Sequence, residues 1–126
     1  MVAGPQRKPL EWVGSSRADL SGFPQDVRRE IGFALFQAQM GGKHKFAKPL
    51  KGFGGGSVLE VVTDDDGNTY RAVYTVKFWL AIYVLHTFQK KSTKGIKTPK
   101  HVIDLVKQRL KQAALHYTES YEQSNC

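Results

Sequence analysis

Five ionisable residues stand within, or at the end of, stretches whose β-branched and aromatic content is typical of strands. Glu60 and Arg71 each interrupt such a stretch, and His86, Lys90 and Lys91 close a third. A charged side chain inside a strand is costly to desolvate, so it is usually paired or functional. Two interpretations are open. Glu60 and Arg71 form a structural ion pair across neighbouring strands, or a concave cationic surface receives phosphate, with Arg71 as bidentate donor and the lysines as point charges.

Aromatic residues near these charges offer a second kind of contact with a nucleic acid. Tyr70, Tyr74 and Phe78 are close in sequence to Arg71 and could stack on bases. Aromatic residues in strands more often belong to the core. The sequence leaves both roles open.

The net charge of +8 is concentrated in two segments of the 126-residue chain. Residues 41–54 hold four lysines and no acid, and residues 89–111 hold eight basic residues, Lys94 and Lys97 among them, against Asp104 alone. The pI is near 9.7. A clustered positive charge attracts polyanions such as nucleic acids, although a solubilising surface has the same composition.

Length and composition favour a single globular domain over residues 1–126, with an ordered core at about 10–117 and a polar C-terminal tail. Cys126 is the only cysteine and cannot form an internal disulfide, which is typical of a reducing cytoplasm. The sequence has no apolar run of spanning length and no signal-peptide core at its N-terminus. A cytoplasmic protein is expected.

No cofactor or metal is expected from the motifs. The segment GFGGGS lacks the strand, the helix and the Lys-Ser/Thr pair of a phosphate-binding loop. The aspartates at 64–66 precede Gly67 and Asn68 and are typical of a hairpin turn. The four histidines are scattered and show no metal-ligand spacing with the cysteine.

The elements that must position these residues follow from periodicity. An amphipathic helix is predicted at about 24–40, with Pro24 at its first position and Gly41-Gly42 at its end. Strands are predicted at 58–62, 69–76 and 81–91, and residues 10–14 as a short strand or extended lead-in. A closing helix begins after Thr98 as N-cap and runs to about Tyr117, followed by a frayed or disordered end. The predicted fold is α+β, a small antiparallel sheet with helices before and after it.

The order of these motifs resembles the RelE/ParE superfamily of type II toxins, and most closely its HigB-like, phage-derived branch. The resemblance covers about residues 10–115 and is carried by AKPLKGFGGG, VLEVV, YRAVYTV and YVLHTFQKKSTKGIKTPK. Its most specific part is the run formed by His86, Phe88, Lys90, Lys91, Thr98 and Pro99.

The resemblance implies a metal-independent endoribonuclease that cleaves mRNA on the ribosome. It implies that Arg71 binds the phosphate in the transition state, that Lys90 and Lys91 act with it, and that Glu60 or His86 is the base. The expected RNA-binding residues are Lys43, Lys45, Lys48, Lys51, Lys94 and Lys97. Two alternatives remain: gyrase inhibition, as in the ParE-like toxins, and a non-catalytic nucleic-acid-binding module.

The resemblance also implies a partner, a helix-turn-helix antitoxin through which the complex binds operator DNA. An acidic partner surface would be steered towards this basic chain. The antitoxin either covers Arg71 and the Lys90-Lys91 pair, or binds the helix at 24–40 and makes the toxin too bulky for the ribosome. The second route is preferred because that helix is amphipathic, close to the N-terminus and distant in sequence from Arg71 and the Lys90-Lys91 pair.

Overall fold

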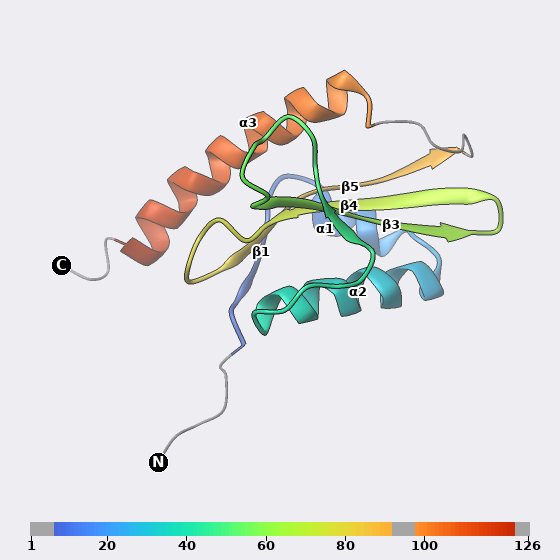
Figure 1. Cartoon of the computed structure of the whole chain (residues 1–126), viewed down its shortest axis with the longest axis horizontal. Coiled ribbons are helices and arrows are strands. Elements are labelled where there is room, and N and C mark those ends of the chain that lie inside the picture. The colour runs from blue at the N-terminus through green and yellow to red at the C-terminus, as the bar shows by residue number, and fades with distance from the viewer. Residues whose placement is uncertain (1–6, 92–97, 123–126) are drawn as a thin grey trace, which may run out of the picture.

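The computed structural model describes residues 7–91 and 98–122, and these form one five-stranded sheet with helices packed on both faces (Figure 1). Along the chain the elements are β1 (Leu10–Trp12), α1 (Ser16–Ser21), α2 (Gln25–Gln39), β2 (Ala47–Pro49), β3 (Val58–Asp65), β4 (Asn68–Thr75), β5 (Ile82–Lys91), α3 (Lys100–Tyr117) and the π-helical turn η1 (Thr118–Glu122).

The sheet has the order β1-β5-β4-β3-β2. The α+β class is therefore confirmed, and so are the three predicted strands, as β3, β4 and β5. The antiparallel pairing predicted for these three strands is present, while β1 pairs with β5 in parallel and makes the sheet mixed. The chain leaves β1 into α1 and α2 before it reaches the other strands, which is the kind of connection that parallel pairing needs.

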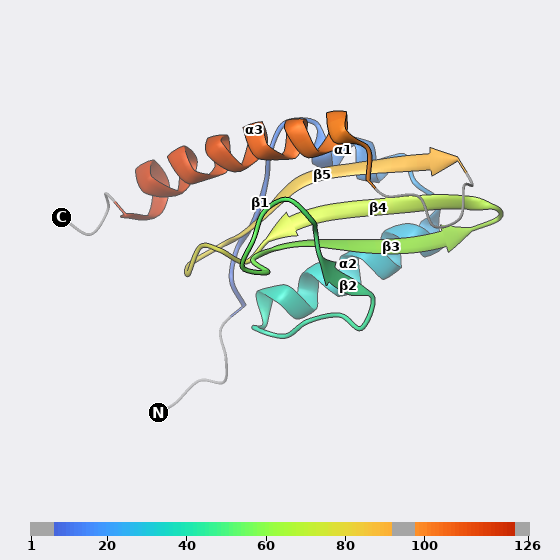
Figure 2. The ribbon, with the colours of Figure 1, turned by 45° about the horizontal axis from the view of Figure 1, so that its top comes forward.

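Helices α2 and α3 cover opposite faces of the sheet (Figure 2). Alternation along β3 and β4 sends Leu59, Val61 and Ala72 to the α2 side, and Val58 and Val73 to the α3 side. The predicted apolar stripe of α2 is buried at Val27, Ile31, Ala34, Leu35 and Ala38. In α3, Val102, Val106, Ala113 and Tyr117 are buried. Each helix therefore buries one apolar face against the sheet, as the amphipathic pattern predicted for the first of them.

Both helices begin one residue later than predicted. Pro24 and Pro99 occupy the N-cap positions, with extended ψ angles of 151° and 152°. Thr98 consequently lies outside α3 rather than at its N-cap. The Thr98 hydroxyl therefore does not cap α3, and it points instead towards Glu60 in the sheet.

Two further segments differ from expectation. Part of the glycine-rich connection at 43–56 forms β2, an edge strand that pairs with β3, and three residues are too few to give a periodic signal. The polar end was expected to be frayed, but residues through Glu122 continue as η1. There Tyr121 stacks on Tyr117 and donates a hydrogen bond to Glu11.

Candidate functional site

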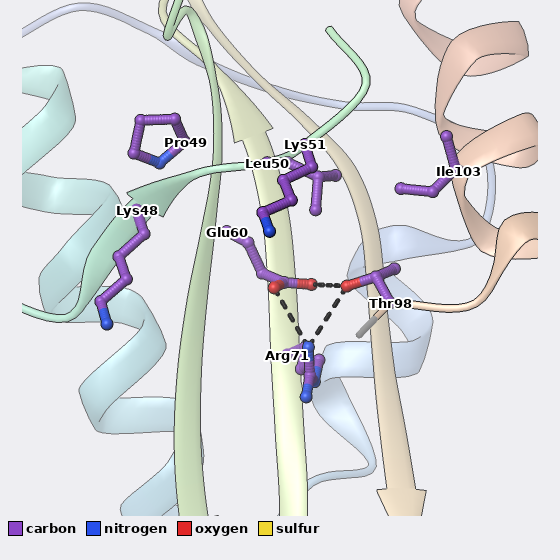
Figure 3. A pocket seen from close by; sticks show the side chains of 8 residues that line it. All are labelled: Lys48, Pro49, Leu50, Lys51, Glu60, Arg71, Thr98 and Ile103. Carbon is purple, nitrogen blue, oxygen red and sulfur yellow. Dashed lines mark hydrogen bonds and ion pairs between the residues drawn. The ribbon is translucent and has the colours of Figure 1, made fainter. Parts of the chain in front are cut away.

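A cavity of about 260 Å³ lies on the α3 face of the sheet, at the N-terminal end of that helix (Figure 3). Its lining residues come from four segments that are distant in sequence: Lys48, Pro49, Leu50 and Lys51 from β2 and the residues after it, Glu60 from β3, Arg71 from β4, and Thr98 and Ile103 from just before α3 and its first turn. Four of the predicted site residues, Lys48, Lys51, Glu60 and Arg71, therefore meet in one place.

Strand alternation brings Glu60 and Arg71 onto the same face. In the β3–β4 ladder, Glu60 is opposite Val73, and Arg71 is opposite Val62, so the two charged residues are diagonal neighbours. Val73 packs in the core beneath α3, which identifies their face as the α3 face. Because α3 covers only part of that face, the two side chains reach the cavity.

Glu60, Arg71 and Thr98 form a closed triangle of hydrogen bonds. Arg71 Nη1 donates to Glu60 Oε1 at 3.1 Å and to Thr98 Oγ1 at 3.2 Å, and Thr98 Oγ1 donates to Glu60 Oε2 at 2.7 Å (Figure 3). The charged side chains are only 10% and 11% exposed. The ion pair expected across neighbouring strands is present, and it lies in the wall of the cavity.

The cavity is cationic on its β2 side. Lys48 is directly opposite Glu60 in the β2–β3 ladder, and Lys51 follows two residues after the strand. Both are exposed, and Figure 3 shows Lys48 on the opposite side of Glu60 from Ile103. The N-terminus of α3 adds a partial positive charge nearby. Two exposed lysines, a nearly buried arginine and a helix N-terminus together favour an anion such as a phosphodiester.

The other predicted lysines are not in this cavity. Lys43 and Lys45 are exposed in the connection between α2 and β2, and Lys45 lies over the ring of Phe46. Lys90 is half-buried in β5 opposite Thr69. The side chain of Lys91 lies outside the described residues, and so do Lys94 and Lys97.

His86 also lies outside the cavity lining. Its ring stacks on Phe88 with centroids 4.9 Å apart, and its Nδ1 is 3.1 Å from Arg109 Nη1. A guanidinium can only donate, so Nδ1 accepts and the proton of the neutral ring is on Nε2. Burial, and then the charge of Arg109, lower the pKa of His86. In this arrangement His86 offers a hydrogen-bond donor, and Glu60 is the better candidate for a base.

Arg109 is held tightly. Its Nη1 also donates to the carbonyl of Leu85 at 2.9 Å. Gly14, at φ +57°, approaches so closely that a Cβ there would lie 2.8 Å from Arg109 Nη2. A side chain at position 14 would displace the guanidinium of Arg109, which is the group that fixes the tautomer of His86.

Replacing Arg109 with glutamine is expected to raise the pKa of His86, because the charge is lost while a donor for Nδ1 is kept. NMR titration of the His86 ring protons measures this. Lys107→Ala removes an exposed cation from the same helix and should leave that pKa unchanged.

The stability of the protein should depend on pH for the same reason. Since folding lowers the pKa of His86 below its ordinary value of about 6.5, the wild-type protein should lose stability as pH falls through about 6.5, and Arg109→Gln should lose less. An unchanged titration in Arg109→Gln would contradict the assigned contact.

The aromatic residues proposed as stacking platforms are buried. Tyr70, Tyr74 and Phe78 are 5%, 0% and 8% exposed, and burial raises the pKa of Tyr74 to about 12. The stacking hypothesis is wrong for all three, because each packs in one of the two cores.

Phe46 and Thr98 are the residues that sequence reasoning missed. Phe46 is 47% exposed and lines a smaller hollow of about 190 Å³ with Lys48, Glu60 and Val62, next to the main cavity. Its position between two lysines, Lys45 and Lys48, was the available signal. Thr98 was interpreted as a helix cap, and only its place in the fold shows that its hydroxyl faces Glu60.

No group of three or more His, Cys, Asp or Glu side chains within 7–91 and 98–122 is arranged to hold a metal ion. No helix in these ranges has both the length and the hydropathy needed to cross a bilayer.

Comparison with known proteins gives a family and a likeness to solved structures. The family described as "Phage derived protein Gp49-like (DUF891)" matches residues 18–111, a range that includes Glu60, Arg71 and Thr98. No curated protein matches the chain. Among solved structures, it is similar to a chain of the toxin–antitoxin complex RelBE2 from Mycobacterium tuberculosis. The identity is 15% over 68% of this chain and 94% of that chain, with a TM-score of 0.46.

Proposed function

The chain belongs to the Gp49-like family of phage-derived proteins, and from that premise we propose that it is the toxin of a type II toxin–antitoxin system. We propose further that it is a HigB-like, metal-independent endoribonuclease that cleaves mRNA on the translating ribosome. The family match and the sequence resemblance support the class. The cationic cavity around the Glu60–Arg71–Thr98 triangle supports the activity.

The observation that carries the proposal is the placement of a carboxylate beside a nearly buried guanidinium in an open, lysine-flanked cavity. RNA can be cleaved by attack of a ribose 2′-oxygen on its own adjacent phosphorus. A base removes the 2′-proton, the new P–O2′ bond forms, and the P–O5′ bond breaks. The products are a 2′,3′-cyclic phosphate and a 5′-hydroxyl whose oxygen takes up a proton.

Arg71 would bind the phosphoryl oxygens as negative charge develops on them. Preorganised donors of this kind typically contribute about 10²–10³ in rate. A phosphodiester that approaches Arg71 competes with Glu60 for the same guanidinium hydrogen atoms. Glu60 would then keep its hydrogen bond from Thr98, which orients the carboxylate towards the 2′-hydroxyl as general base.

Lys48 and Lys51 would anchor neighbouring phosphates as point charges. Phe46 would offer its exposed ring to an unstacked base, since base–aromatic stacking is worth about 1–3 kcal/mol. Lys90, Lys91, Lys94 and Lys97 are proposed as contacts further along the RNA or ribosome. A helix-turn-helix antitoxin would neutralise the toxin and direct the complex to operator DNA.

Induction of the protein in a bacterial host should arrest growth and produce new 5′-hydroxyl ends within translated messages. Mapping of 5′-hydroxyl ends across the transcriptome, with and without an inhibitor of translation initiation, measures both cleavage and its dependence on the ribosome. Intact messages with DNA breaks and an SOS response would indicate gyrase inhibition instead. Intact messages and intact DNA with slowed growth would indicate a non-catalytic nucleic-acid-binding module.

A further inference from the structure

The connection between β4 and β5 presents a tryptophan to solvent, at the end of the molecule away from the cavity. Trp79 is 79% exposed, although its neighbour Phe78 is buried. Phe78 stacks on Tyr117, the last residue of α3, and Figure 1 shows the yellow connection beside that end of the helix. Ile103, in the wall of the cavity, is about four turns away on α3, roughly 21 Å at 1.5 Å per residue.

The exposed ring belongs to a segment that is tethered on both sides. Before Trp79, the ring of Phe78 stacks on Tyr117 with centroids 4.8 Å apart. After it, the N–H of Leu80 donates a hydrogen bond to Tyr117 Oη at 3.1 Å. Both neighbours of Trp79 are thus fixed to the same tyrosine while the indole stays outside. A ligand that binds this ring does not have to order the segment that carries it, which favours affinity.

A hollow of about 380 Å³ lies beside the exposed ring. The described residues that line it are Arg7, Lys8, Pro9, Trp79, Leu80 and Tyr121, and none of these is acidic. The nearby Glu11 accepts a hydrogen bond from Tyr121. Small-ligand sites usually have volumes of about 300–1,000 Å³. The hollow is therefore large enough for a ligand that contacts both the ring and the basic side chains.

Three basic residues accompany the ring. Lys8 Nζ lies 5.1 Å from the centre of the Trp79 ring, which is the distance of a cation–π contact. Arg7 is exposed and lines the hollow, and the exposed Lys77 is two residues before Trp79. This end of the molecule thus combines an open aromatic face with positive charge.

A nucleobase with its phosphates matches both features. An unstacked base stacks on an aromatic side chain whatever its identity, and phosphate oxygens accept hydrogen bonds from arginine and lysine. An anionic lipid surface would also attract the cations, but stable attachment to it uses a larger apolar surface than Trp79 and Leu80 provide. The combination favours single-stranded RNA.

We infer that Trp79 and its basic neighbours form a second RNA-binding site, in which one unpaired base stacks on the indole and the flanking phosphates bind Arg7 and Lys77. We call Arg7, Lys8, Lys77 and Trp79 the Trp79 platform. The site goes beyond the proposed cleavage and does not depend on it, because it lies at the other end of α3 from the cavity. A second point of attachment raises the overall affinity for RNA without any change at the cavity.

The probe is a short 2′-O-methyl oligoadenylate, which offers bases and phosphates but no 2′-hydroxyl that could attack phosphorus. Stacking of a base on the indole should quench the tryptophan emission of the wild-type protein. An abasic oligomer of the same length supplies the phosphates alone and should quench far less. The chain has two tryptophans, so Trp79→Leu, which retains Trp12, should show no quenching and thereby assigns the signal to Trp79.

The cations are tested with a matched control. Arg7→Ala combined with Lys77→Ala should raise the oligomer concentration at half-maximal quenching by at least roughly fivefold, because two phosphate contacts are lost. Lys107→Ala removes an exposed cation from α3 and should change that concentration by less than about twofold.

A variant without the charges of the cavity separates the two sites. Arg71→Met with Glu60→Leu replaces the buried ion pair by apolar side chains, which is often neutral for folding, and its emission should be quenched like that of the wild type. Binding to this variant is then measured by the anisotropy of a labelled oligomer. Addition of Trp79→Leu should weaken the affinity by about 5- to 150-fold, the usual contribution of one stacked base.

Quenching that needs bases, is absent in Trp79→Leu and persists in the cavity variant supports the proposal. It is overturned if the wild type is not quenched, if the abasic oligomer quenches equally, or if the cavity variant loses the quenching. A blue shift of the emission on vesicles of equal parts phosphatidylglycerol and phosphatidylcholine, without quenching by the oligomer, assigns the surface to lipid and also overturns it. Quenching of a protein that leaves translated messages intact supports this site and refutes the nuclease, and cleavage by a protein that is not quenched does the reverse.

Discussion

Replacing Arg71 with alanine is expected to abolish RNA cleavage and to lower the free energy of unfolding by about 3 kcal/mol. The rate should fall by at least roughly 100-fold, because a preorganised phosphate donor is lost. The stability should fall because Glu60, whose side chain is 11% exposed, loses its cationic partner, and breaking a buried pair on one side costs about 3–5 kcal/mol. Loss of an exposed charge would change stability by less than about 0.5 kcal/mol, but the Arg71 side chain is only 10% exposed.

A double variant separates the two effects. Arg71→Met with Glu60→Leu removes both charges, and apolar replacement of a buried ion pair is often neutral or stabilising. The melting temperature should therefore return towards that of the wild type while cleavage stays absent. Arg17→Ala, which removes an exposed arginine from α1, should change stability by less than about 0.5 kcal/mol and leave cleavage intact. If Arg71→Ala still cleaves RNA, Arg71 has a purely structural role.

Replacing Glu60 with glutamine is expected to lower the single-turnover cleavage rate by about 10²–10⁴-fold, the usual contribution of a general base. The amide keeps an oxygen that can accept from Arg71. Its NH₂ group replaces Oε2 and can donate to the Thr98 hydroxyl, which is able to accept as well as donate. Ground-state geometry is thus largely preserved, and RNA binding should change far less than the rate.

Asp104→Asn is the control for this substitution, because it neutralises an exposed acid on α3 and should cleave like the wild type. Rates measured across a pH series add a second readout, since the limb that reports a titrating base should disappear in Glu60→Gln. A near-wild-type rate in Glu60→Gln would show that the carboxylate only positions Arg71, and that another group removes the 2′-proton.

The placement of Glu60 and Arg71 on one face of the sheet could be predicted from the sequence. Glu60 and Arg71 stand in long regular strands joined by a tight hairpin, so their shared face and their pairing follow from a period of two. The helices could be predicted for the same kind of reason, because their apolar stripes recur with helical spacing over 15 and 18 residues.

The position of His86 could not be predicted, because β5 contains an irregularity that no local pattern reveals. Val73 pairs with His86 while the next residue, Tyr74, pairs with Val84, so Leu85 is an extra residue. This bulge turns both Leu85 and His86 towards α3, where Arg109 contacts them. Without it, His86 would share the side of Val84, facing α2.

The cationic wall of the cavity depends on tertiary contacts that sequence reasoning does not supply. Charge clustering marked both residues 41–54 and residues 89–111, and among the described residues the lysines that line the cavity are Lys48 of β2 and Lys51 just after it. Of the two roles left open for the aromatic residues near Arg71, the structure shows the core role, because burial of a tyrosine in a central strand removes a large apolar surface from water. Phe46 escapes burial because it precedes a short edge strand.

The Glu60–Thr98 hydrogen bond joins residues 38 positions apart in sequence, and that distance has a consequence for how the protein is made. Synthesis proceeds from the N-terminus, so Glu60 and Arg71 emerge with their hairpin well before Thr98 and α3. A growing or truncated chain that stops before residue 98 has the guanidinium and the carboxylate without the hydroxyl that orients them. On the proposed chemistry, the chain becomes active only when translation has passed α3, which spares the ribosome that is still producing it.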